Sequence, residues 1–350
     1  MAQVAGTPAV TPPAAAGGVS RRRVRVGDRV FRGSSLVIGA CLILLLFVIL
    51  GVLAKGGADA FKTFGLSLIT GRNWNPVAGR QSFGALPFIL GTLITSSLAV
   101  IMAVPISVGL ALLLNEMPSS WLRNPLAVFV DLLAAIPSVV YGLWGFYFLV
   151  PAFDQHVEPF LNNTLGAIPV IGKLFENQAG SGGNIFVAGV ILAIMIVPIV
   201  TAVTREVVAI VPHELREGAM ALGATRYEVI RMSVLPFARS GIVGATMLGL
   251  GRALGETIAV AMVIGNSTRL GVSLFRPGYT IPAVIANEFR EASTGIHKSA
   301  LLALALMLVV ISLILAALSR LVIRRAAGAF EESGVDAEAE VAALETQGLA

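Results

Sequence analysis

Long apolar runs separated by short polar segments dominate the pattern of this chain. Each run has the length of a membrane-spanning helix, roughly 20 residues. Pro105, Pro137 and Pro198 fall inside three of the runs, where membrane helices tolerate proline because neighbouring helices supply replacement hydrogen bonds. We therefore expect an all-α membrane protein with six transmembrane helices, at Leu36–Ala54, Leu86–Leu114, Leu126–Val150, Ile185–Ile210, Gly241–Ile264 and Leu301–Ile323.

The polar segments set the expected domain boundaries. Residues 1–34 form a basic tail that we expect to be cytoplasmic and disordered, residues 35–325 a transmembrane domain, and residues 326–350 an acidic cytoplasmic tail. The last 25 residues carry six acids and no base, a composition typical of a solvated, disordered segment. Trp74, in the polar segment 55–83, indicates an interfacial element outside the membrane.

The distribution of basic residues predicts the orientation. Six spans place both termini on one side, and 15 of the 25 Lys and Arg residues fall on that side, against nine on the opposite side and Arg252 within the membrane. Positive charge collects in cytoplasmic loops. The termini and the polar segment 212–239 are therefore predicted to be cytoplasmic.

Composition narrows the function classes. Hydrophobic residues make up 56% of the 350 residues and charged residues 13%, with a mean hydropathy of +0.86, whereas a soluble domain has about 25% charged residues. The single cysteine, Cys41, excludes an intrachain disulfide. The sequence has no GxxxxGK[ST], no HExxH and no cluster of Cys or His at metal-ligand spacing. We expect no catalysis, no metal and no cofactor within this chain.

One polar insert, REGAMALGATRYEVIRMSVLP at Arg216–Pro236, interrupts the apolar pattern. It predicts two short helices on either side of Gly223, which can take up the left-handed conformation that ends a helix. Thr225 is predicted to cap the second helix, over Thr225–Val234. Leu235-Pro236 is predicted to close the unit, since proline disfavours helical geometry in the residue before it.

This insert resembles the coupling loop of ABC-importer permeases, whose pattern is E-A-A, three residues, G, nine residues, I, one residue, L-P. Here Gly218 replaces the middle Ala and Ser233 replaces the β-branched residue. The resemblance implies that the two helices dock in a groove on a separate ATPase subunit. The residues that carry it are Arg216, Glu217, Ala219, Gly223, Leu235 and Pro236. We expect apolar anchors at Ala219, Leu222, Val229 and Ile230, and a charged rim at Arg216, Arg226 and Arg231.

A DNA-binding helix-turn-helix is a competing interpretation of the same spacing of small, glycine and aliphatic residues. From Pro212 to Arg239 there are four Arg and three Glu, a net charge of +1 that is a poor footprint for phosphate backbones. Apolar spans adjoin the insert on both sides. We therefore expect no nucleic-acid partner.

Two charges lie inside the fifth predicted span. Arg252 comes eleven residues after Gly241, a depth of roughly 16 Å at 1.5 Å per residue, and Glu256 follows one turn later. One interpretation is a buried ion pair that locks the helix against its neighbours. The other is a translocation site in which Arg252 binds an oxyanion bidentately. Glu256 would hold the guanidinium in place and compete with the anion for it, so that the anion is not trapped.

The run GRALGETIAVAMVIGN around these charges, with REGAMALGAT in the insert and FILGTLITS…VPISVGLALLLNE in the second span, resembles PstC-type permeases of bacterial phosphate ABC importers. The resemblance covers residues 84–323. It implies the type I ABC-importer architecture and the import of inorganic phosphate across the cell membrane. It also implies as partners two copies of an ATPase subunit, a PstA-type second permease and an extracytoplasmic phosphate-binding protein, besides membrane lipid.

Two other classes remain open at this point. A secondary transporter or channel would use Arg252 and Glu256 for anion passage without ATP, and a purely structural subunit would leave the insert unexplained. ATP-dependent uptake separates the importer from both. Glu116 and Asp131, near the ends of apolar runs, are assigned no role.

Overall fold

The computed structural model describes residues 21–77, 79–116, 120–166, 168, 172–176 and 182–346, with the backbone alone at 21–28, 120 and 322–346. The chain divides into two units, Met1–Val52 and Leu53–Ala350. Five helices are long and apolar enough to cross a membrane, and a bent pair of helices makes a sixth span. The predicted all-α membrane architecture is confirmed.

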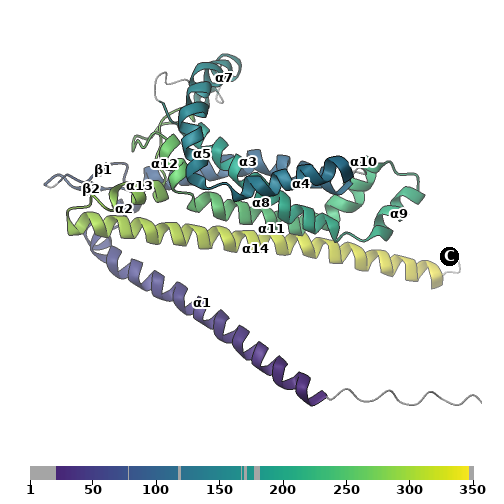
Figure 1. The fold of residues 1–350 in the computed structure, drawn as a ribbon. Helices are drawn as coiled ribbons and strands as arrows, with labels where there is room; N and C mark the ends of the chain where they lie inside the picture. The colour runs from purple at the N-terminus through teal and green to yellow at the C-terminus, as the bar shows by residue number, and fades with distance from the viewer. Residues whose placement is uncertain are drawn as a thin grey trace, which may run out of the picture. The chain divides into compact units, whose positions relative to one another are not determined.

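The long helices are α1 (Arg21–Phe64), α3 (Leu86–Glu116), α8 (Ile185–Ala209), α11 (Leu235–Gly255) and α14 (Gly295–Thr346) (Figure 1). The bent pair begins with α4 (Ser120–Ala135) and α5 (Ser138–Trp144). The other α-helices are α2 (Ser67–Thr70), α6 (Val150–Ala152), α7 (Glu158–Leu165), α9 (His213–Ala221), α10 (Arg226–Val229), α12 (Ile258–Val263) and α13 (Ile281–Glu288). Three π-helical turns, η1 (Gly145–Leu149), η2 (Phe153–Val157) and η4 (Ile230–Val234), a 3₁₀ turn, η3 (Gly172–Leu174), and an antiparallel hairpin of β1 (Trp74–Asn75) and β2 (Ser82–Phe83) complete the described elements.

Helix α8 is the centre of the second unit. It is apolar on all sides, which is typical of a helix surrounded by others, and it packs against α3, α11 and α4. Small residues allow the close approach: a Cβ on Gly189 would lie 2.6 Å from a methyl of Leu98 on α3, and one on Gly249 would lie 2.7 Å from Val200. The buried core around α8 includes Ile185, Ile191, Leu192 and Ile196.

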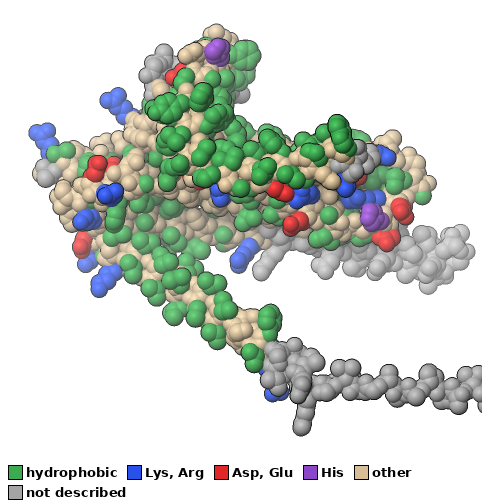
Figure 2. Space-filling view, viewed as in Figure 1, with side chains coloured by type: hydrophobic (Ala, Val, Ile, Leu, Met, Phe, Trp, Pro, Cys, Tyr) green, Lys and Arg blue, Asp and Glu red, His purple; other side chains and the backbone are tan. Residues whose placement is uncertain are grey.

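Apolar side chains also cover much of the outer surface of the helical body, while charged side chains gather near its ends (Figure 2). On α4, Phe129 and Leu132 are 59% and 62% exposed. Such a surface fits a bilayer, where lipid tails cover the apolar side chains.

The third predicted span, Leu126–Val150, is broken. Helix α4 ends at Ala135 and α5 begins at Ser138, with the chain bent by 93° between them. Pro137 is the cause, because it disfavours helical geometry at Ile136 and donates no hydrogen bond. The Tyr141 hydroxyl donates to the Leu133 carbonyl at 2.9 Å and so satisfies part of the exposed end of α4. By contrast, Pro105 and Pro198 lie inside unbroken helices as predicted.

Three predicted boundaries also differ from the structure. Helix α1 begins at Arg21, within the predicted tail, and α14 continues to Thr346, beyond the predicted end at Ile323. Much of the predicted polar segment 151–182 is helical as well, through α7. In each case the helix extends into residues too polar to register as part of an apolar run.

Candidate functional site

The predicted insert forms two short helices, α9 and α10, joined by a turn and followed by α11. Helix α9 ends at Ala221, and Gly223 follows with φ of +88°, the left-handed conformation predicted for it. The Gly223 N–H donates to the Met220 carbonyl at 2.9 Å and the Ala224 N–H to the Ala219 carbonyl at 3.1 Å. No atom lies within 4 Å of where a Gly223 Cβ would be, so the need for glycine is conformational.

Thr225 caps α10 as predicted. Its hydroxyl accepts from the Glu228 N–H, while the Glu228 carboxylate accepts from the Thr225 N–H at 2.7 Å, forming a reciprocal capping box. The Thr225 N–H, with a smaller contribution from its hydroxyl, lowers the pKa of Glu228 below its usual value. The turn is thus fixed by local hydrogen bonds.

The predicted second helix, Thr225–Val234, does not end at Leu235-Pro236. It passes through the π-helical turn η4 directly into α11, whose first turn contains Pro236. Proline donates no hydrogen bond to the preceding turn, and the switch to π-helical bonding just before Pro236 places that loss where the regular α-helical ladder is already interrupted. The second helix of the coupling unit, which comprises α9, α10 and η4, and the membrane helix α11 therefore form one continuous helical rod.

The inner face of this unit packs against the ends of α8 and α3. Val229 and Val234 are 6% and 0% exposed and form a core cluster with Val208 and Val211. Ala219 packs against this cluster. The expectation that Val229 projects as an anchor is wrong, because its periodicity places it on the inner face, whereas Ala219 is partly buried and also lines the groove on the outer face.

The outer face carries other apolar side chains. Leu222, a predicted anchor, is 91% exposed, and Tyr227 and Met232, which the sequence did not single out, are 69% and 70% exposed. A groove of about 630 Å³ runs over this surface. Its lining comprises Glu214, Leu215, Gly218, Ala219, Leu222, Gly223, Ala224, Glu228, Met232 and Ser233.

The charged residues of the unit separate into two groups. Glu217, Arg226 and Arg231 are exposed, as expected of a rim. The Arg216 side chain is only 16% exposed; it pairs with Glu116 at the end of α3, at 3.2 Å, and donates to the Val208 carbonyl of α8, at 3.0 Å. Arg216 therefore ties α9 to two membrane helices, which corrects its predicted place on the rim and gives Glu116 a partner.

The second candidate site lies where the fifth predicted span, Gly241–Ile264, is interrupted. Helix α11 ends at Gly255, Glu256 is extended with ψ of 128°, and α12 starts at Ile258. The Thr257 hydroxyl donates to the Gly255 carbonyl at 3.1 Å, and the Ala259 N–H donates to Glu256 Oε1 at 3.4 Å. A break at this depth is tolerated where such local partners exist or where the backbone lines a cavity.

The two helix breaks lie next to each other. Helix α5 packs against α12 so closely that a Cβ on Gly142 would lie 2.9 Å from the Ala259 Cα. Arg252, in the last turn of α11, is exposed and lies within electrostatic reach of Tyr141 on α5. Irregular backbone and a cation are thus brought together within the apolar part of the molecule.

Arg252 and Glu256 do not pair. No ion pair joins them in the described structure, where Arg205 pairs with Asp131, Arg216 with Glu116 and His297 with Glu288. Glu256 is the C-cap residue of α11, with a helical φ of −67°, so it lies one turn beyond Arg252 as predicted, and the chain leaves the helix only after it. A preformed ion-pair lock between the two is therefore not present.

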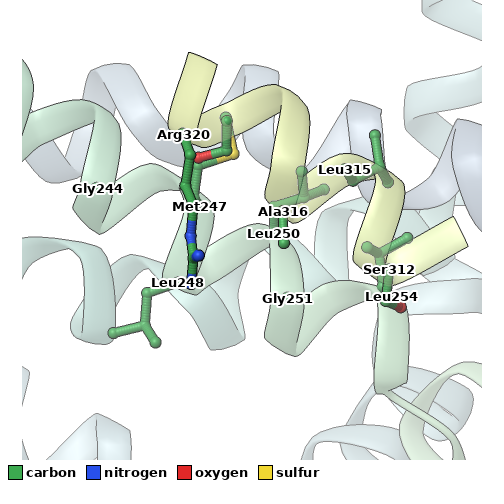
Figure 3. Close-up of a pocket in the computed structure, with 11 residues that line it drawn as sticks. Gly244, Met247, Leu248, Leu250, Gly251, Leu254, Ser312, Leu315, Ala316 and Arg320 are labelled. Carbon is green, nitrogen blue, oxygen red and sulfur yellow. The ribbon is translucent and has the colours of Figure 1, made fainter. Parts of the chain in front are cut away.

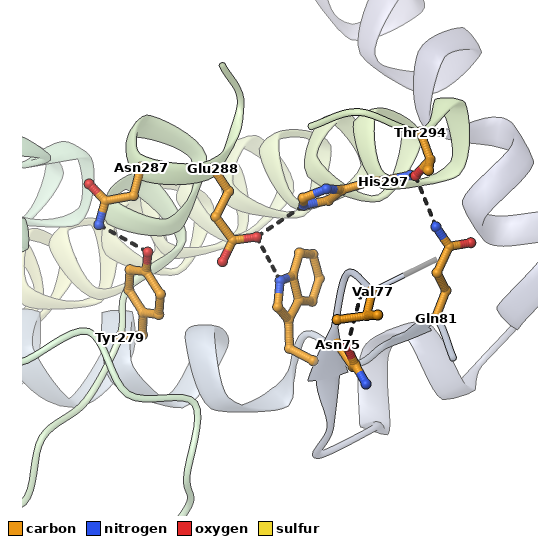
Figure 4. Close-up of polar contacts among 9 residues, drawn as sticks. Asn75, Val77, Gln81, Tyr279, Asn287, Glu288, Thr294 and His297 are labelled. Atoms are coloured by element: carbon orange, nitrogen blue, oxygen red, sulfur yellow. Dashed lines mark hydrogen bonds and ion pairs between the residues drawn. The ribbon is translucent and has the colours of Figure 1, made fainter. Parts of the chain in front are cut away.

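A polar cluster joins the β1–β2 hairpin to α13 and α14 (Figure 4). Glu288 accepts from Trp74 Nε1 at 2.8 Å and lies 3.0 Å from His297 Nε2, while the Gln81 amide donates to Thr294 at 2.9 Å. Trp74 is 9% exposed and packs on Phe83, so its ring is part of a core within the predicted interfacial element. The cluster holds the hairpin in place.

Sequence comparison finds relatives along most of the chain. The family model described as binding-protein-dependent transport system inner membrane component matches residues 103–328. A phosphate transport system permease protein PstC of Pasteurella multocida is 48% identical over 298 residues, 85% of this chain and 92% of that protein. The PstC of Mesorhizobium japonicum is 42% identical over 87% of this chain and 92% of its own length.

The structural comparison agrees on the fold. A bacterial alginate ABC transporter crystallised with its alginate-bound periplasmic protein has a chain that matches with a TM-score of 0.56 and 18% identity, over 85% of this chain and 96% of that one. At that identity the likeness concerns the fold alone. Together with the family match and the relatives above 40% identity, it shows that the chain belongs to the family of binding-protein-dependent transport system inner membrane components.

Proposed function

We propose that this chain is the permease subunit of an ATP-driven importer and that its substrate is inorganic phosphate. The observation that carries the proposal is the 48% identity to a phosphate transport system permease over 85% of this chain and 92% of that protein, because so high an identity extends over nearly the whole of both chains. The continuous rod of α10, η4 and α11 supports ATP coupling, since a force on the exposed face of α9 and α10 passes directly into a membrane helix.

The partners follow from the exposed surfaces and the chemistry. The groove around Leu222 and Met232 accepts an ATPase subunit, and Arg216, Glu217, Ala219, Gly223, Leu235 and Pro236 transmit its movement. A PstA-type second permease completes the membrane domain, and two copies of the ATPase and an extracytoplasmic phosphate-binding protein complete the importer. Both termini and the coupling unit lie in the cytoplasm, as the distribution of Lys and Arg favours.

In this assembly Arg252 binds the translocating phosphate. Its planar guanidinium matches two oxygens of phosphate, and the described structure contains no carboxylate within 4.0 Å that would occupy it. Glu256, in the extended segment beside it, repels the anion and keeps it from being trapped. The broken backbone at Gly255–Ile258 gives the anion a path through the apolar layer.

The test is uptake by the complete importer reconstituted in liposomes with its binding protein. Radiolabelled phosphate should accumulate only with ATP, and vanadate should stop it. Uptake driven by an ion gradient without ATP would overturn the assignment in favour of a secondary transporter. ATP-dependent uptake of another solute with no competition by phosphate would overturn the substrate.

A further inference from the structure

A cavity of about 340 Å³ lies between α11 and α14 (Figure 3). Most of its wall is apolar, but Ser312, Ser319 and Arg320 from α14 add two hydroxyls and a guanidinium. The remaining lining residues are Gly244, Met247, Leu248, Leu250, Gly251, Leu254, Leu315 and Ala316. Arg320 is the one ionisable side chain in this lining.

The Arg320 side chain crosses from α14 toward α11. Figure 3 shows it extending past Met247, with its guanidinium near Leu248. An arginine that only anchored the helix at the membrane surface would turn its head group toward water. Here the side chain is exposed, but it also lines the cavity beside α11.

This charge has no carboxylate partner. Helix α11 contains no Asp or Glu, and α14 contains none before Glu331. No ion pair to Arg320 is found where side chains are described. The one charge in the cavity lining is therefore positive and has no carboxylate partner among the described residues, so the cavity is suited to an anion.

Arg252 does not line this cavity, but Leu248 does. Leu248 and Arg252 are four residues apart in one helix and therefore lie one above the other. The cavity that Arg320 lines thus reaches, at Leu248, to about one helical turn, roughly 5 Å, from the level of Arg252. Two guanidinium groups follow each other along α11 toward the coupling unit, with no carboxylate between them.

We propose that Arg320 is a second phosphate-binding residue, which receives the anion from Arg252 on its way to the cytoplasm. The inference rests on the proposed function and deepens it. Arg320 contributes a bidentate donor, and Ser312 and Ser319 contribute hydroxyl donors to the remaining oxygens. Binding at two successive cations keeps the anion compensated through the apolar layer without holding it at one of them.

The experiment compares Arg320→Gln, Arg320→Lys and a control, Lys298→Gln, in the intact importer. Lys298 lies near the opposite end of the same helix and outside the cavity. Arg320→Gln should lower ATP-dependent phosphate uptake by about 10-fold or more, because a hydrogen bond to a charged group contributes about 1.5–3 kcal/mol. Arg320→Lys should fall between, and Lys298→Gln should match the wild type. If Arg320→Gln does not assemble, Arg320→Lys alone decides by the same measurement.

Two results would overturn the inference. One is phosphate uptake by Arg320→Gln at the wild-type rate, in an experiment in which the wild type itself imports phosphate. The other is that Arg320→Gln copurifies with less anionic phospholipid than the wild type and regains uptake in liposomes rich in phosphatidylglycerol. That result would assign Arg320 to binding a lipid headgroup. A wild-type importer that does not transport phosphate overturns the proposed function itself, so the two failures are distinguishable.

Discussion

The two ends of the helical rod formed by α10, η4 and α11 differ in how their charged side chains are paired. Near its beginning, Arg216 of α9 is bonded to both α3 and α8, and Thr225 and Glu228 hydrogen-bond to each other in the cap of α10. At its end, Arg252 is exposed and unpaired in the described structure, and the helix stops at Gly255. One end is fixed by polar contacts, whereas the other leaves a cation without a partner.

This difference suggests a division of labour within one helix. A joint that passes on movement must not rearrange under load, so its polar groups are best satisfied internally. A transient anion site must keep its donors available, since a donor already paired with a carboxylate has to be freed before it can bind phosphate. Substitutions at the two ends should therefore fail in different ways.

The largest effects are expected for substitutions of Arg252, of which Arg252→Lys is the mildest. Lysine keeps the charge but loses the two-pronged planar donor, so phosphate uptake should fall roughly 10- to 100-fold, the equivalent of a lost charged hydrogen bond. The assembled complex should be recovered in normal amount. Arg290→Lys, an exposed residue outside the membrane helices, is the matched control and should transport normally.

The double substitution Arg252→Gln with Glu256→Gln sharpens this test. Because the structure holds no pair between the two side chains, neutralising both should leave assembly near the wild-type level. It should also stop phosphate import. Import at the wild-type rate would refute Arg252 as a translocation residue.

Gly223→Val should fail at the other end of α11. A β-branched residue at φ of +88° costs on the order of 1–3 kcal/mol, so the turn between α9 and α10 should distort. Transport should drop strongly while the chain still inserts in the membrane. Gly109→Ala, at a helical position of α3 with open space around its Cβ and outside the groove, is the control. Normal copurification of the ATPase with normal stimulated hydrolysis would contradict the role given to Gly223.

Much of this end of the molecule could be predicted from the sequence. Gly223 and Thr225 have the conformation and the cap expected of them because both depend on neighbours within three residues. The inward direction of Arg216 could not be predicted, since its partner Glu116 lies 100 residues earlier and comes near only when α3 packs on α8.

The breaks in two spans mark the other limit of the sequence. Pro137 interrupts its span while Pro105 and Pro198 do not, and residue type alone does not separate them. The end of α11 at Gly255 was hidden within an apolar run whose composition suits an unbroken helix. Hydropathy predicts where the chain crosses the apolar layer, but not where the helix is interrupted within it.

A smaller effect is expected for Arg216→Ala. The substitution removes the ties to Glu116 and to the Val208 carbonyl, so phosphate imported per ATP hydrolysed should fall several-fold while insertion and basal hydrolysis persist. Arg290→Ala, which removes an exposed charge outside the coupling unit, serves as the control. Adding Glu116→Ala to Arg216→Ala should have little further effect, because residues that act through one contact are not additive. If Glu116→Ala lowered the phosphate imported per ATP by a further, independent factor in the double variant, the two residues would not act through their mutual contact.

The smallest effect concerns the α10 cap and its dependence on pH. The pKa of Glu228 is lowered from its usual value of 4.5 by the Thr225 N–H and hydroxyl. A carboxylate with a lowered folded-state pKa stabilises the fold fully above its usual pKa, and this stabilisation is lost as the pH falls through the lower value. Hydrogen exchange of the 224–230 backbone, corrected for intrinsic rates, should therefore show protection that declines only below pH 4.5.

Two variants test the origin of that decline. Glu228→Gln should keep most of the protection and lose its pH dependence, because Gln also accepts from the cap N–H but does not titrate. Thr225→Ala should lower protection at every pH, since it removes the hydroxyl that accepts from the Glu228 N–H. Both should transport phosphate nearly as well as the wild type, because the Arg216 ties and the buried Val229 and Val234 still hold the unit in place. A decline that persists in Glu228→Gln would assign the pH dependence to another group.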